Sequence, residues 1–150
     1  MLNILKDRLA ASVRTTFSTD QTALRTSDKS VLRLAAAAGV LLLVIGLRFI
    51  VWPTSAARTF GVPDLPTDVT LHQVVGFRDL WLGALLVGLC WYRQWRALSL
   101  WFGLATLVCL ADATIVAQTT GKSLQLTFHV ASAMVCTALA RATWHRAEHS

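Results

Sequence analysis

Five ionisable side chains interrupt long apolar segments of this 150-residue chain. They are Arg48, Arg78, Asp79, Asp112 and His129. Together they supply the groups that acid–base chemistry needs: carboxylates accept protons, an imidazole exchanges them near neutral pH, and a guanidinium stabilises negative charge. Each charge at the centre of a membrane helix costs roughly 2.5–3.5 kcal/mol on insertion scales, so such residues need partners or a function.

These side chains are predicted to share one layer of the membrane. Each lies a few residues inside its apolar segment, or roughly 6–10 Å from the segment end at the rise of an α-helix. Two arginines and two aspartates give a neutral set. One arrangement pairs Arg48 with Asp79. Arg78 would then pair with Asp112, and His129 would bridge the two pairs.

Two further polar residues are expected at the mouth above this layer. His72 lies two helical turns before Asp79, and Gln125 lies one turn before His129, so each shares a helix face with its neighbour. The rotation of each helix is not set by the sequence. The predicted catalytic residues are Asp79, Asp112, His129 and Arg78, and the predicted substrate-binding residues are Arg48, His72 and Gln125.

The elements that must position these residues are four apolar segments. They cover about residues 31–52, 69–92, 97–118 and 123–143, and each can span a hydrocarbon core of roughly 30 Å. Only 15% of residues are charged, mean hydropathy is +0.54, and the alternation typical of a membrane barrel is absent. The predicted fold is all-α, a four-helix transmembrane bundle.

The ends and the first connection complete the expected domain organisation. Residues 1–30 carry apolar residues three or four apart with basic residues between them, which favours an amphipathic interfacial helix, although a partly disordered tail fits too. The transmembrane domain is expected at 31–145, and a polar tail at 146–150. Residues 53–68 begin with a short helical stretch and are long enough to cover the helix ends.

The charge distribution predicts the orientation. Ten Lys and Arg residues lie on the side of both termini: six in residues 6–33, two at 93 and 96, and two at 141 and 146. Only Arg58 and Lys122 lie on the other side. Both termini are therefore expected in the cytoplasm, with the chain in a bacterial inner membrane. The net charge of +6 fits contact with a lipid bilayer better than with nucleic acid.

No cofactor or metal site is expected from the sequence. The four apolar segments contain neither a His-x-x-x-His nor a Glu-x-x-His pair, and two arginines close to the polar layer would repel a cation. The three cysteines fall in apolar segments without a C-x-x-C motif, so they are interpreted as small buried hydrophobes.

Several short motifs resemble those of a known family. They are Gly46-Leu47-Arg48, Phe60-Gly61, Gly76-Phe77-Arg78-Asp79, Asp112 and His129. Over about residues 35–145 the chain resembles a family of small four-helix integral membrane proteins with a domain of unknown function, distantly DoxX-like. The resemblance implies the four-helix bundle and the polar layer, and it implies no reaction.

Two main functional interpretations follow from the residues. In the first, a membrane-embedded pocket binds a small amphiphilic or lipid-like molecule, with acid–base chemistry of an isomerase, cyclase or hydrolase type as an open extension. In the second, the chain is a non-enzymatic accessory or structural subunit, and the polar layer joins the helices. A homo-oligomer or a membrane-protein partner fits either one. Proton-coupled transport ranks last because the chain lacks the repeats of a transporter.

Overall fold

The computed structural model describes residues 28–60, 70–119 and 123–149. In this part of the chain, four helices are long and apolar enough to cross a membrane: the first helix Asp28–Val51, α3 Thr70–Trp91, α4 Trp95–Thr119 and α5 Ser123–Glu148. The predicted all-α bundle is confirmed. By length and composition these helices mark an integral membrane protein. Most of the predicted surface helix of residues 1–30 lies outside the described residues.

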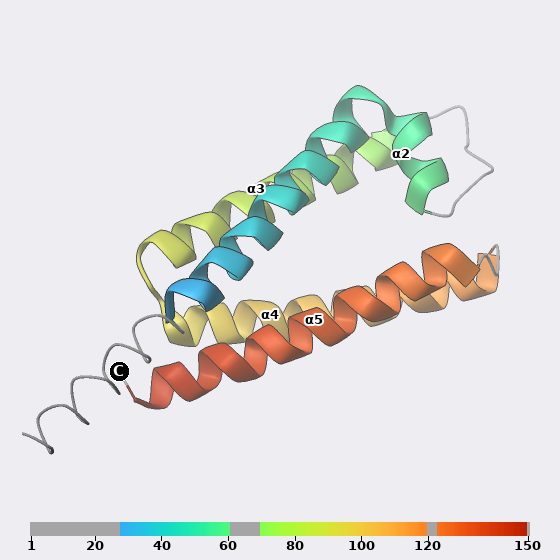
Figure 1. The fold of residues 1–150 in the computed structure, drawn as a ribbon. Helices are drawn as coiled ribbons and strands as arrows, with labels where there is room; N and C mark the ends of the chain where they lie inside the picture. The colour runs from blue at the N-terminus through green and yellow to red at the C-terminus, as the bar shows by residue number, and fades with distance from the viewer. Residues whose placement is uncertain (1–27, 61–69, 120–122, 150) are drawn as a thin grey trace, which may run out of the picture.

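The four long helices form two antiparallel pairs (Figure 1). The first helix lies beside α3, and α4 lies beside α5. The pairs meet at one end, which we call the closed end; it holds Asp28, the turn from α3 to α4 and the end of α5 at Glu148. They diverge toward the opposite end, where the short helix α2, Pro53–Phe60, lies between them; we call this the α2 end.

Glycines hold the first helix against α3. A Cβ atom on Gly46 would lie 2.7 Å from the carbonyl oxygen of Gly76, and one on Gly83 would lie 2.7 Å from the carbonyl oxygen of Gly39. These distances are too short for any side chain, so the two backbones approach as closely as small residues allow. The contact fixes the position of the first helix, including Arg48 near its end.

The closed end has a hydrophobic core that joins both pairs. Leu86 of α3 and Leu98 and Phe102 of α4 are fully buried there. Ala35 of the first helix and Leu139 of α5 complete the contact from the other two helices. Because all four helices contribute, this core fixes the two pairs at one end only.

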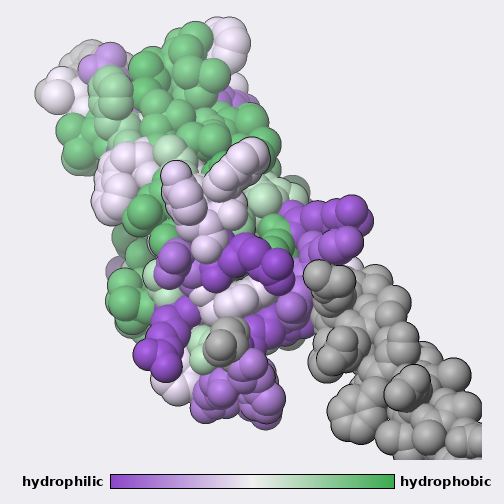
Figure 2. Space-filling view, turned by 90° about the vertical axis from the view of Figure 1, so that its left-hand side faces the viewer, coloured by the Kyte–Doolittle hydropathy of each residue, from purple (hydrophilic) through white to green (hydrophobic). Residues whose placement is uncertain are grey.

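A polar cluster closes the same end, which Figure 2 turns toward the viewer with its gathered hydrophilic side chains. Asp28 accepts a hydrogen bond from Arg146 Nε at 2.9 Å and forms an ion pair with Arg93 at 3.5 Å. Both guanidinium groups lie over the ring of Trp95, at 5.8 Å and 5.9 Å from its centroid. We call these four residues the Asp28 cluster.

The turn that carries Arg93 has a left-handed backbone. Arg93 has φ of 52°, its N–H donates to Cys90 O at 3.2 Å, and Gln94 N–H donates to Leu89 O at 3.0 Å. This is a Schellman ending, in which glycine normally occupies the left-handed position. Arginine there brings its side chain to Asp28.

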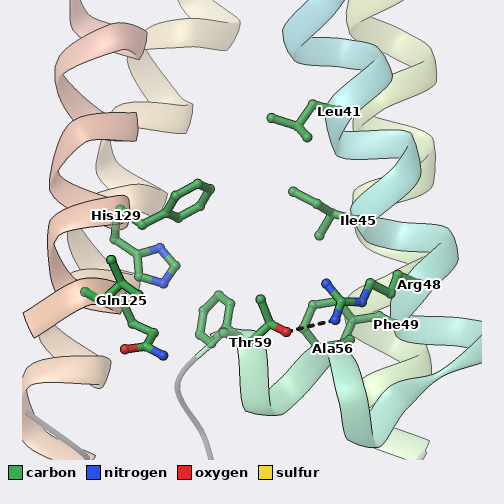
Figure 3. A pocket seen from close by; sticks show the side chains of 11 residues that line it. Leu41, Ile45, Arg48, Phe49, Ala56, Thr59, Gln125 and His129 are labelled. Atoms are coloured by element: carbon green, nitrogen blue, oxygen red, sulfur yellow. Dashed lines mark hydrogen bonds between the residues drawn. The ribbon is translucent and has the colours of Figure 1, made fainter. Parts of the chain in front are cut away.

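At the α2 end, the chain turns back directly after the first helix. Pro53 begins α2, as suits a residue without an N–H to donate in the first turn. Ala56 and Ala57 are buried against Phe49 of the first helix. This packing places Phe60 against His129 of α5, with ring centroids 4.6 Å apart, and directs the Thr59 hydroxyl toward Arg48 of the first helix (Figure 3).

Candidate functional site

A cavity of about 480 Å³ lies at the α2 end, between the first helix, α2 and α5 (Figure 3). Its walls are mostly apolar, with Leu41 and Ile45 on one side and Phe128 on the other. Four polar residues also line it: Arg48, Thr59, Gln125 and His129. The cavity exists because the helix pairs diverge here, and α2 covers only part of the gap.

Arg48 reaches from the first helix toward α2. Its Nη2 donates to Thr59 Oγ1 at 2.8 Å and to Ser55 Oγ at 3.0 Å. No acidic side chain forms an ion pair with Arg48 within residues 28–60, 70–119 and 123–149. Nη2 also lies 3.4 Å from the backbone carbonyl oxygen of Ser55, so the described partners of this positive charge are all neutral oxygens of α2.

His129 projects from α5 into the cavity (Figure 3). The residue is 6% exposed, and its ring lies edge-on to Phe60 at 4.6 Å and to Phe128 at 5.8 Å between centroids. Neither ring nitrogen forms a hydrogen bond with another described residue. Gln125, one turn nearer the α2 end, points into the same space (Figure 3).

The other predicted catalytic residues lie outside the cavity lining. Asp79 is 6% exposed and accepts a hydrogen bond from Arg78 Nε at 3.0 Å. Asp112 of α4 lies within electrostatic range of Arg78 and of His129. His129 is thus the residue common to the cavity and to this charged group.

The expected cross-bundle ion pairs are wrong for the described residues. Asp79 pairs with its sequence neighbour Arg78, and Arg48 binds the hydroxyl groups of α2. The physical reason is helix rotation: adjacent residues differ by about 100° around the axis, and the sequence does not show which one faces the bundle. Within the described residues, Arg78 forms its ion pair with Asp79 of its own helix and none with Asp112.

His72 occupies a different place from the expected one. Its ring stacks on Phe49 with centroids 6.3 Å apart, and it does not line the cavity. Its Nδ1 is buried and has no hydrogen-bond partner among the described residues. The structure therefore brings three predicted site residues together around one space, Arg48, Gln125 and His129, and places His72 behind Phe49.

A family model described as "Domain of unknown function (DUF4267)" matches residues 39–143. The chain belongs to the DUF4267 family. Comparisons with curated proteins and with solved structures give no match. The predicted membership of a small family of unknown function is confirmed, whereas the distant likeness to DoxX stays a prediction.

The DUF4267 segment contains the whole cavity lining, from Leu41 to His129. Two members of the Asp28 cluster, Asp28 and Arg146, lie outside the matched segment. The part of the chain shared with the family therefore includes every side chain that forms the cavity.

Sequence reasoning missed the contribution of α2. Thr59 binds Arg48, and Phe60 packs against His129, although both lie in a segment expected only to cover the helix ends. The signal was present: Pro53 after a membrane helix and a helical stretch of eight residues predict a chain reversal. That reversal returns Thr59 to Arg48, eleven residues earlier in the sequence.

Within the described residues of this DUF4267 protein, no group of three or more His, Cys, Asp or Glu side chains is placed to hold a metal ion. The polar residues of the cavity are one fixed cation and three side chains that can donate or accept hydrogen bonds. Such a set binds an anionic or hydrogen-bond-accepting group, while the apolar walls suit a hydrocarbon portion.

Proposed function

We propose that this DUF4267 protein binds a small amphiphilic molecule in the cavity between the first helix, α2 and α5. One observation carries the proposal: Arg48, Thr59, Gln125 and His129 converge on a space whose other walls are apolar. Its volume of about 480 Å³ falls within the range of roughly 300–1,000 Å³ typical of small-molecule pockets.

The unsatisfied polar groups support a binding site more than a purely structural role. Polar residues that join membrane helices satisfy one another, because an unpaired group inside the membrane is costly. Arg48 has no described acidic partner, and the buried ring of His129 has no described hydrogen-bond partner. A ligand with its own polar atoms would satisfy both.

Acid–base chemistry is the further step of the proposal. His129 would transfer a proton to or from the ligand, because its ring faces the cavity. Asp112 lies within electrostatic range of His129, and Arg48 would stabilise negative charge on the ligand. Arg78 and Asp79 would support Asp112 without touching the ligand. The reaction would be of an isomerase, cyclase or hydrolase type.

We also propose the orientation predicted by the charges, with both termini in the cytoplasm and the chain in a bacterial inner membrane. In the described part, the closed end carries Lys29, Arg33, Arg93, Arg96, Arg141 and Arg146. The excess of basic residues at this end supports a cytoplasmic location. The cavity would then lie in the outer leaflet.

An accessory role is the second candidate, and the glycines favour it. A Cβ atom on Gly88 of α3 or on Gly103 of α4 would meet nothing within 4 Å. Membrane helices use such positions to approach other helices closely, so a second copy or another membrane protein could pack there. Introducing leucine at both positions would abolish a complex built on this contact and leave the cavity intact.

The ligand can be tested by lipid analysis of the purified protein. We expect an amphiphile to co-purify with the unaltered protein in mild detergent, and native mass spectrometry would show the bound mass. An Arg48→Ala/His129→Ala variant should lose it. An Arg58→Ala/His145→Ala variant is the matched control, because it removes the same residue types at exposed positions outside the cavity. Equal retention by both variants would contradict the proposal.

A further inference from the structure

We infer that the cavity takes a single-chain amphiphile with an anionic head, which enters sideways from the bilayer. The inference rests on the proposed function, and it adds the class of ligand, its orientation and its route. Three features of the described residues support it: a gradient of polarity along the cavity, an uncompensated cation at one end, and an opening toward lipid.

The gradient runs along the axis of the first helix. Arg48 and Thr59 line the cavity at the α2 end, while Ile45 and Leu41 line it three and seven residues deeper on the first helix. At the rise of an α-helix these steps are roughly 5 Å and 10 Å. A bound amphiphile is therefore oriented with its head toward the α2 end and its chain toward the middle of the bilayer.

The charge of the lining selects the head group. Arg48 is the only charged residue among the described cavity-lining side chains, and none of them is acidic. Its Nη2 is engaged by Ser55 and Thr59, which leaves other guanidinium N–H groups for a ligand. An arginine binds carboxylate and phosphate groups through paired hydrogen bonds, whereas it repels an ammonium group.

The buried imidazole adds the second contact with the head. His129 projects into the cavity opposite Arg48, and Gln125 lies beside it at the same end (Figure 3). The ring is more than nine-tenths buried, and no described residue accepts or donates a hydrogen bond to it. An anionic head between Arg48 and His129 gives the ring a partner that the protein does not supply.

The route follows from which lining residues face lipid. Leu41, Leu124 and Phe128 line the cavity, yet they are 54%, 78% and 56% exposed. On membrane-spanning helices, such exposed apolar side chains contact acyl chains. The cavity is therefore continuous with the bilayer between the first helix and α5, where the two helix pairs diverge (Figure 1).

The size of the cavity limits the number of hydrocarbon chains that the ligand can have. A volume of about 480 Å³ lies in the lower half of the range of roughly 300–1,000 Å³ for small-molecule pockets. That space suits one hydrocarbon chain of moderate length with its head. A diacyl phospholipid has a second chain that would have to remain outside, in the bilayer.

Photolabelling in phosphatidylcholine nanodiscs tests this inference. Three probes would share one diazirine-bearing alkyl chain and carry a carboxylate, an alcohol or an ammonium head. We expect the carboxylate probe to label peptides spanning residues 41–48 and 124–129 at least fivefold more than the other two. Arg48→Ala should remove this preference. Arg48→Lys and the exposed control Arg58→Ala should keep it, and the head comparison on the unaltered protein needs no variant to fold.

The outcomes separate this inference from the proposed function. Equal labelling of these peptides by all three heads would leave an amphiphile site but overturn the anionic head. If diacyl phosphatidic acid displaced the carboxylate probe as effectively as decanoate does, the inference of a single-chain ligand would be wrong. If acetate displaced the carboxylate probe as effectively as decanoate does, the inference that the ligand enters from the bilayer would be wrong. Labelling of neither peptide by any probe would contradict the proposed function itself.

Discussion

The two ends of the bundle use similar side chains in opposite ways. At the closed end, Arg146 and Arg93 share the carboxylate of Asp28 and lie over the ring of Trp95. At the α2 end, the described partners of Arg48 are neutral hydroxyl and carbonyl oxygens of α2, and His129 has aromatic neighbours but no described hydrogen-bond partner. Within the described residues, Arg93 and Arg146 have a carboxylate partner at the closed end, whereas Arg48 beside the cavity has none.

This difference indicates which end is structural. A cation paired with a carboxylate and packed on an aromatic ring gains little from a further ligand, and its loss leaves the partner carboxylate unpaired. A cation without a counter-charge beside a cavity gains most from a ligand. We therefore expect the loss of Arg146 from the Asp28 cluster to lower stability, and substitutions around the cavity to lower binding.

The largest effect on stability is expected at Gly76, where the first helix and α3 are in close contact. A Cβ atom on Gly76 would lie 2.7 Å from Ile50 Cγ1 and 2.8 Å from Gly46 O, so Gly76→Leu must separate the first helix from α3. We expect a loss of about 3 kcal/mol in the free energy of unfolding, measured by SDS titration. Gly103→Leu is the matched control, because a Cβ there meets nothing within 4 Å; an equal loss in the control would contradict the role of the glycine contact.

The second-largest effect should show that the closed end and the α2 end act independently. Arg146→Ala removes the hydrogen bond to Asp28, the hydrogen bond from Nη1 to Ala142 O and the contact with Trp95. We expect a loss of about 2 kcal/mol in stability, with labelling of the cavity unchanged. The exposed Arg141 on the same helix is the control position. Lost labelling in an Arg146→Ala protein that remains folded would show that the ends are not independent.

A substitution of His129 is expected to have a smaller effect on stability, and one of opposite sign. His129→Leu keeps an apolar side chain against Phe60 and removes a buried ring without a described hydrogen-bond partner. Stability in the ligand-free protein should stay the same or rise by about 1 kcal/mol, while ligand affinity falls about tenfold. If the polar layer served only to join helices, the same variant would be destabilised and ligand binding would not be a property of this site.

The smallest effect concerns Arg93. Its φ of 52° is unfavourable for arginine, so Arg93→Gly relieves backbone strain while it removes an ion pair of 3.5 Å between partly exposed groups and the contact with the Trp95 ring. These two changes should cancel to within about 0.5 kcal/mol. Arg93→Ala keeps the strained backbone and also loses the ion pair, so we expect it to be about 1 kcal/mol less stable than Arg93→Gly. Thermal unfolding of the two variants side by side would show the difference.

The helices could be predicted from the sequence because their signal is local. Length and hydropathy identify the four spans, and the first helix and α3–α5 confirm them within a few residues. The approximate depth of Arg48 and His129 also follows from counting residues along each span. These properties depend on one helix at a time, so no knowledge of packing is needed.

The contacts between helices could not be predicted in the same way. Which of Arg78 and Asp79 faces the bundle depends on rotation of α3, which the sequence does not determine; the structure buries Asp79. The divergence of the helix pairs depends on a core that all four helices form at the closed end alone. The cavity, which results from that divergence, therefore appears only in three dimensions.

The most direct test is an electron cryo-microscopy map of the protein in lipid nanodiscs, with a fiducial binder to increase its size. We expect non-protein density with its head between Arg48 and His129 and its chain along Leu41 and Ile45, and we expect Arg48→Ala to remove it. A map in which α5 packs directly against the first helix, with no space between Arg48 and His129, would contradict a ligand site at the α2 end.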